Sequence, residues 1–146
     1  MKRVALLDTN VWVSALLNKV GMPARVVNAW RTGTIEVVTA LPILEEIGDV
    51  LRRPRIKKKY GIEDEEIAQY LELIAARATV VQVAGKLRLC RDPDDDVHLE
   101  AAIAGSAKYL VTRDDDIKRD LDLMREMKRH GIEVVSVSSF LALIQG

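Results

Sequence analysis

Short runs rich in Val, Ile and Leu alternate along this chain with stretches of helical periodicity. The strand-like runs are residues 2–7, 35–39, 79–83, 109–112 and 132–137. The helical stretches are residues 12–17, 23–31, 42–51, 64–78, 96–107, 121–131 and 138–145. Strands separated by helices predict parallel pairing, because parallel neighbours need a long crossover connection. We therefore expect an α/β fold with a parallel sheet of about five strands and helices on both faces.

The length of 146 residues predicts a single domain, residues 1–146, with one core. Aromatic residues make up only 4% of the chain, so this core should be aliphatic. No apolar run approaches the ~20 residues of a membrane helix, and the few apolar residues before Asp8 are too short for a signal peptide. The single cysteine, Cys90, excludes an internal disulfide. We expect a cytoplasmic protein that does not contact a membrane.

Acidic residues follow two of the strand-like runs. Asp8 comes directly after the first run, and Asp114 comes two residues after Thr112, where the fourth run ends. Ligands of open parallel sheets bind at the carboxyl ends of the strands, so both acids should lie at one edge of the sheet. Helix capping is the alternative role for each, because aspartate is common at helix starts.

Further aspartates precede the helical stretch 96–107: Asp92, Asp94, Asp95 and Asp96. A helix start favours one or two acids, not four. Helical periodicity places Asp95 in line with Leu99 and Ala102, on the stripe that should face the core. Asp96 lies about 100° away from Asp95 around the helix. We expect Asp95 to face inward, Asp94 to cap the helix, and both Asp94 and Asp96 to face solvent.

The same argument separates Glu45 from Glu46 in the helical stretch 42–51. The centre of its apolar face lies about 100° from Glu46 and about 160° from Glu45. Glu45 should therefore be solvated, whereas Glu46 flanks the buried face and could reach over the edge of the sheet. A plain surface position is the alternative for Glu46.

Four carboxylates could meet in one compact site: Asp8, Glu46, Asp95 and Asp114. Without a cation they would repel one another and some would stay protonated. Oxygen ligands alone select hard divalent ions, here Mg²⁺ or Mn²⁺. Such an ion can activate water and neutralise phosphate charge, which is the chemistry of phosphodiester hydrolysis.

Four blocks of the chain resemble the PIN-domain family of ribonucleases, in the order that the family has them. They are LLDTNVWVSALL, LPILEEIGDVLRRPR, DPDDDVHLEAAIAGSAKYLVTRDDDI and IEVVSVSSFLALI. The likeness is closest to the VapC-like branch, the toxins of prokaryotic toxin–antitoxin systems. It implies a small three-layer α/β/α domain that uses four acids and one or two Mg²⁺ or Mn²⁺ ions to cut single-stranded RNA. It also implies an antitoxin protein as a partner and a homodimer.

The resemblance assigns catalysis to Asp8, Glu46, Asp95 and Asp114, and metal binding to Asp8, Asp95, Asp114 and Asp116. Three more residues fall where the family orients the carboxylates or a metal-bound water: Thr9, Asn10 and Thr112. A shift of one residue within DPDDD would make Asp96 the third ligand in place of Asp95.

We expect residues 53–63 to form a loop. Basic residues gather in this loop and directly before it: Arg52, Arg53, Arg55, Lys57, Lys58 and Lys59. They either contact RNA phosphates or form a solvated surface. Trp12 and Trp30 should be core or dimer contacts. We expect His98 on the side of a helix, and His130 as the basic end of another.

Two other classes of function fit parts of the pattern. Phosphatases of the haloacid-dehalogenase type and receiver modules also place an aspartate at a strand end beside Mg²⁺. The phosphatase pattern has a second acid two residues after the first, where this chain has Asn10. The other alternative is a PIN domain that binds RNA or a protein partner without catalysis, which would not need the complete set of acids.

Overall fold

Strands and helices alternate along the chain as the sequence predicts. The structure, a computed structural model, describes residues 2–85, 87–90, 93–113 and 121–145. The strands are β1 (Arg3–Leu7), β2 (Ile35–Ala40), β3 (Thr79–Val81), β4 (Tyr109–Thr112) and β5 (Glu133–Ser136). The helices are α1 (Thr9–Leu17), α2 (Met22–Arg31), α3 (Leu41–Leu51), α4 (Pro54–Tyr60), α5 (Asp64–Arg77), α6 (Pro93–Ala104), α7 (Leu121–Arg129) and α8 (Val137–Gln145). None of the helices described is long and apolar enough to cross a membrane.

The five strands form one parallel sheet in the order β3-β2-β1-β4-β5. This confirms the predicted α/β fold. The chain runs outward from β1 to β2 and β3, then returns to the other side of β1 for β4 and β5. The direction of winding therefore reverses between β1 and β4, where Leu7 pairs with Val111. Open α/β sheets bind their ligands at such a reversal, beyond the carboxyl ends of the strands.

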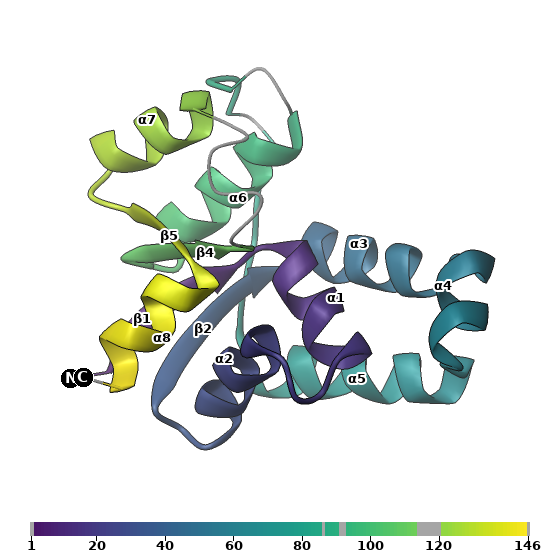
Figure 1. The fold of residues 1–146 in the computed structure, drawn as a ribbon. Helices are drawn as coiled ribbons and strands as arrows, with labels where there is room; N and C mark the ends of the chain where they lie inside the picture. Colours follow the sequence, from purple (N-terminus) through teal and green to yellow (C-terminus); the bar gives the residue numbers. More distant parts are fainter. Residues whose placement is uncertain (1, 86, 91–92, 114–120, 146) are drawn as a thin grey trace.

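Helices cover both faces of the sheet and make it the middle of three layers (Figure 1). On one face, α6 packs against β1 and β2, and α7 packs beside it against β5. On the other face, α1, α2 and α8 form a contiguous group, and α3 and α5 extend it beyond α1. The inner strands β1, β2 and β4 are therefore largely shielded from water, which explains their near-continuous apolar runs, whereas the edge strand β3 is mostly exposed.

The core is mainly aliphatic, and an aromatic cluster lies between α1, α2 and α5. Trp12 is fully buried, and its ring meets that of Trp30 edge-on at a centroid distance of 5.2 Å. The Tyr70 hydroxyl donates a hydrogen bond of 2.7 Å to the backbone carbonyl of Trp12. Both tryptophans therefore belong to the core of this chain, which is one of the two roles that the sequence predicts for them.

Residues 54–60 form helix α4, where we expected a loop. Pro54 occupies the first turn, where its missing N–H is not needed for helix bonding. Gly61 ends the helix with a φ of 64°, a left-handed conformation that glycine adopts without strain. None of the residues of α4 is buried. The segment lacks an apolar face, so its periodicity gives no signal for a helix.

Candidate active site at the carboxyl edge of the sheet

Asp8 connects β1 to α1 at the point where the winding of the sheet reverses. Its N–H donates a hydrogen bond of 3.0 Å to the carbonyl of Val111, which extends the β1–β4 pairing. Its own carbonyl accepts a 3.0 Å bond from the N–H of Val11 in the first turn of α1. The Asp8 side chain, however, makes no capping hydrogen bond. The carboxylate is therefore not used as a helix cap.

Thr112, at the end of β4, binds the Asp8 carboxylate instead. Its hydroxyl donates a hydrogen bond of 3.2 Å to Oδ2 of Asp8. Thr112 is buried, and the Asp8 side chain is 24% exposed. This bond restricts rotation of the carboxylate and leaves Oδ1 facing His98, whose Nε2 atom lies 3.8 Å away.

Glu46, on α3, is half-buried, whereas its neighbour Glu45 is exposed. This difference confirms the helix phase predicted for residues 42–51. Burial is the main cause that raises the pKa of the Glu46 carboxyl above its ordinary value. Asp94 and Asp8 raise the pKa further, because a second negative charge nearby disfavours ionisation.

Two other groups act on the Glu46 carboxyl in the opposite direction. His98 lowers its pKa through electrostatic attraction, more strongly than either aspartate raises it, and the Thr9 hydroxyl lowers it to a smaller extent. Glu46 therefore lies within electrostatic reach of Asp8, which follows β1, and of side chains from α1 and α6. Thr9 is buried and Asn10 half-buried, both in the first turn of α1.

Asp95, in the first turn of α6, is predicted to face inward, and the structure buries it less than Asp96. It is half-buried, and its Oδ2 atom is shielded from solvent. This oxygen finds no hydrogen-bond partner in the part of the chain that the structure describes. A buried carboxylate oxygen without a partner is costly, and a bound cation would remove that cost.

Asp96 and Asp94 differ from the sequence prediction. Asp96 is only 4% exposed, although we expected it to face solvent. Its Oδ1 atom accepts hydrogen bonds from the backbone N–H groups of Leu89 at 3.0 Å and Cys90 at 2.9 Å. Asp94 is exposed as predicted, but it does not cap the helix, because α6 already begins at Pro93. Asp96 thus binds the backbone, whereas the shielded oxygen of Asp95 has no hydrogen-bond partner in the described chain.

His98 is a member of the site that the sequence prediction missed. Its side chain is 9% exposed, and its Nδ1 atom lies 2.8 Å from the backbone carbonyl of Asp94. Residues three apart are neighbours on a helix surface, so the spacing of Asp95 and His98 could have revealed this position.

The arrangement fits a divalent cation by the chemistry of its donors. The carboxylates of Asp8 and of Asp94 on α6 act electrostatically on Glu46 of α3, and one buried oxygen of α6, Oδ2 of Asp95, has no partner in the described chain. Oxygen donors of this kind suit Mg²⁺ or Mn²⁺. Among the described residues, no three acidic, histidine or cysteine side chains by themselves enclose a metal position. The predicted ligands Asp114 and Asp116 follow β4 and lie outside the described residues.

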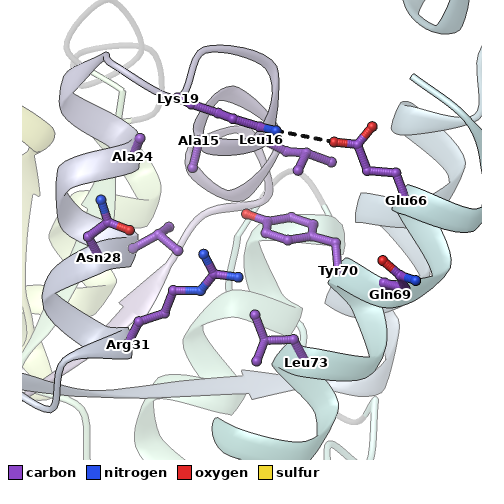
Figure 2. Close-up of a pocket in the computed structure, with 11 residues that line it drawn as sticks. Ala15, Leu16, Lys19, Ala24, Asn28, Arg31, Glu66, Gln69, Tyr70 and Leu73 are labelled. Atoms are coloured by element: carbon purple, nitrogen blue, oxygen red, sulfur yellow. Dashed lines mark hydrogen bonds and ion pairs between the residues drawn. The ribbon is translucent and has the colours of Figure 1, made fainter. Parts of the chain in front are cut away.

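A pocket lies away from these acids, between α1, α2 and α5 (Figure 2). Its volume is about 360 Å³. An ion pair of 3.5 Å between Lys19 and Glu66 crosses its rim, and the Arg31 side chain borders it opposite Tyr70. The acids of the candidate active site do not line this pocket.

The basic residues 52–59 are also separate from the acids. They lie at the end of α3 and on α4, which Figure 1 shows at the outer end of the helical layer. Arg52, Arg53 and Arg55 are exposed, whereas Lys57 makes an ion pair of 2.7 Å with Asp64. This contact lowers the pKa of the Asp64 carboxyl below its ordinary value.

Fold and site together define an open α/β protein with acidic side chains at the reversal point of its sheet. Comparison with known proteins then identifies the family. The PIN domain family matches residues 4–116, and the chain belongs to this family. PIN domains are generally nucleases, which supports a hydrolase. This membership sets aside the phosphatase and receiver alternatives.

Two individual proteins show the extent of the likeness. The uncharacterized protein MJ1680 of Methanocaldococcus jannaschii is 28% identical over 134 residues, which are 92% of this chain and 85% of that protein. A chain in the crystal structure of VapBC2 from Rickettsia felis bound to a DNA fragment from their promoter is 16% identical, with a TM-score of 0.53. That alignment covers 91% of this chain and 98% of the other. It shows the same fold and confirms the predicted three-layer architecture.

Proposed function

We propose that this protein is a metal-dependent endoribonuclease that hydrolyses phosphodiester bonds of single-stranded RNA. One observation carries the proposal: in a chain of the PIN family, Asp8 after β1 and Asp94 on α6 both lie within electrostatic reach of Glu46 on α3. Acids so arranged suit a divalent cation next to a phosphate.

Asp8 and Asp95 would hold Mg²⁺ or Mn²⁺, with Asp114 and Asp116 as further ligands from the segment after β4. A bound ion would make coordinated water more acidic and neutralise charge on the phosphate. Thr112 keeps the Asp8 carboxylate in one orientation through its hydrogen bond. Thr9 and Asn10, at the start of α1, stand where they can orient the acids or a water molecule.

Glu46 is suited to proton transfer. Its raised pKa means that this carboxyl holds a proton at a higher pH than an ordinary glutamate does. A group of this kind can take a proton from the attacking water and release it afterwards. Glu46 is thus a catalytic residue in the proposed reaction.

We also propose that the exposed arginines of the basic segment, Arg52, Arg53 and Arg55, contact RNA phosphates. Lys57 can join them only if it releases Asp64. The VapBC2 structure supports the further proposal of an antitoxin protein as partner of this chain. The predicted homodimer belongs to the same proposal, and sedimentation of the purified protein tests it.

The decisive experiment maps RNA ends after purified protein is incubated with a mixed pool of single-stranded RNA. We expect new internal ends with Mg²⁺ or Mn²⁺, no cleavage in EDTA, and recovery when excess Mg²⁺ is added. The Asp8→Asn protein should remain folded and inactive. Undiminished cleavage in EDTA would overturn the metal mechanism. Metal binding without any cleavage would instead favour the non-catalytic PIN domain.

A further inference from the structure

His98 has a free lone pair that faces Asp8. A carbonyl oxygen can only accept a hydrogen bond, so the contact of 2.8 Å to the Asp94 carbonyl requires the hydrogen on Nδ1. In the neutral ring, the lone pair is then on Nε2. This atom is buried and has no hydrogen-bond partner in the described chain.

The distance from His98 to Asp8 suits two ligands of one ion. Nε2 of His98 lies 3.8 Å from Oδ1 of Asp8. Two atoms that each lie about 2.1 Å from an octahedral ion are about 3.0 Å apart as neighbours and about 4.2 Å apart when opposite. The observed separation falls between these limits, so a small side-chain rotation brings both atoms onto one ion.

Two buried polar atoms without partners occur together on α6. They are Oδ2 of Asp95 and Nε2 of His98, three residues apart and thus on the same side of the helix. A metal-binding histidine commonly donates its other ring N–H to a backbone carbonyl, as His98 does. His130 makes a similar contact of 2.9 Å with the Glu126 carbonyl, but it is exposed. Burial beside Asp8 therefore distinguishes His98.

We propose that Nε2 of His98 is a nitrogen ligand of an ion that it shares with Asp8, and that the site consequently selects Mn²⁺ over Mg²⁺. Imidazole nitrogen suits transition-metal ions, whereas Mg²⁺ prefers oxygen ligands throughout. The inference deepens the proposed function and rests on the metal site that it contains. It adds a ligand to the predicted set of acids.

The chain has only two histidines, His98 and His130, so a spectroscopic test is unambiguous. Electron spin echo measurements on bound Mn²⁺ detect directly coordinated nitrogen. The wild-type protein should show a nitrogen coupling that changes when histidine alone is labelled with ¹⁵N. The coupling should persist in His130→Asn and disappear in His98→Phe. The ratio of Mn²⁺ to Mg²⁺ affinity, measured by calorimetry, should fall at least about tenfold in His98→Phe.

The outcomes separate this inference from the proposed function. If Mn²⁺ binds without histidine coupling, His98 is not a ligand, and the metal site itself stands. If the wild-type protein binds no Mn²⁺ at all, the metal centre and the nitrogen ligand are both overturned. If His98→Phe does not fold, the labelled wild-type and His130→Asn proteins still decide, since only His98 can then give the signal.

Discussion

Thr112 and Asp8 are 104 positions apart in the sequence, and a hydrogen bond of 3.2 Å joins their side chains. They meet because β1 and β4 are parallel neighbours, so that both strands end at the same edge of the sheet. The bond therefore joins a residue of the candidate site to the last residue of strand β4. It also explains why the carboxylate at the start of α1 does not cap that helix.

Replacing Thr112 with valine should weaken metal binding with little loss of stability. The variant keeps the shape of the side chain but loses the donor that orients Asp8. Mn²⁺ affinity should fall about 10–100-fold, as is typical when a group that supports a metal ligand is removed. The free energy of unfolding should change by about 1 kcal/mol. Calorimetric titration and urea unfolding measure the two effects.

Thr39→Val is the matched control for this change. Thr39 lies fully buried on β2, and its hydroxyl has no hydrogen-bond partner in the described structure. Its removal should leave Mn²⁺ affinity unchanged and stabilise the fold, because an unpaired buried hydroxyl costs about 1–3 kcal/mol. An equal loss of affinity in both variants would contradict the orienting role of Thr112.

Asp95 and Asp96 should respond to substitution in opposite ways. Asp95→Asn removes charge from the metal site and should lower RNA cleavage by orders of magnitude while the fold persists. Asp96→Ala leaves two backbone N–H groups without their acceptor and should destabilise the protein by about 2–4 kcal/mol. Cleavage per folded molecule should survive that change. An inactive but stable Asp96→Ala protein would show that Asp96 is the ligand.

Glu46→Gln should impair cleavage, and Glu45→Gln should not.

The same pair tests the raised pKa of Glu46 through stability measured without metal. A carboxyl whose pKa is raised by folding stabilises the protein at low pH and loses this contribution as pH rises through the folded-state value. Glu46→Gln should therefore match the wild type below the ordinary value of 4.5 and exceed its stability at neutral pH. Urea unfolding over a pH series that starts below the ordinary value of 4.5 and ends at neutral pH measures the difference. A flat profile would argue against burial of this carboxyl.

Gly105→Ala should displace α6, the helix that carries Asp95 and His98. A Cβ atom on Gly105 would overlap Cγ1 of Val38 on β2, and valine side chains adapt poorly. We expect a loss of about 1–3 kcal/mol in stability, together with weaker metal binding. Adding Val38→Ala should restore part of the stability and part of the metal affinity. If the effects of the two substitutions on stability simply add, the proposed clash is refuted.

Periodicity in the sequence was sufficient for the framework of this protein. Runs of Val, Ile and Leu in alternation with helical stretches admit few arrangements other than a parallel sheet between helices. The 3.6-residue repeat also separates Glu46 from Glu45, because the two faces of α3 have opposite solvent exposure. Strand ends then suggest Asp8 as a site residue, since the carboxyl ends of parallel strands share one edge.

Tertiary structure alone decided which polar residues of α6 face the protein. Helix periodicity assumes one buried face, but the start of α6 is covered on a second side by residues 89 and 90, whose backbone binds Asp96. His98 enters the site because β1 places Asp8 opposite the first turns of α6, a contact between residues 90 positions apart. Local sequence patterns cannot predict these contacts, because the residues that make them meet only after the sheet has formed.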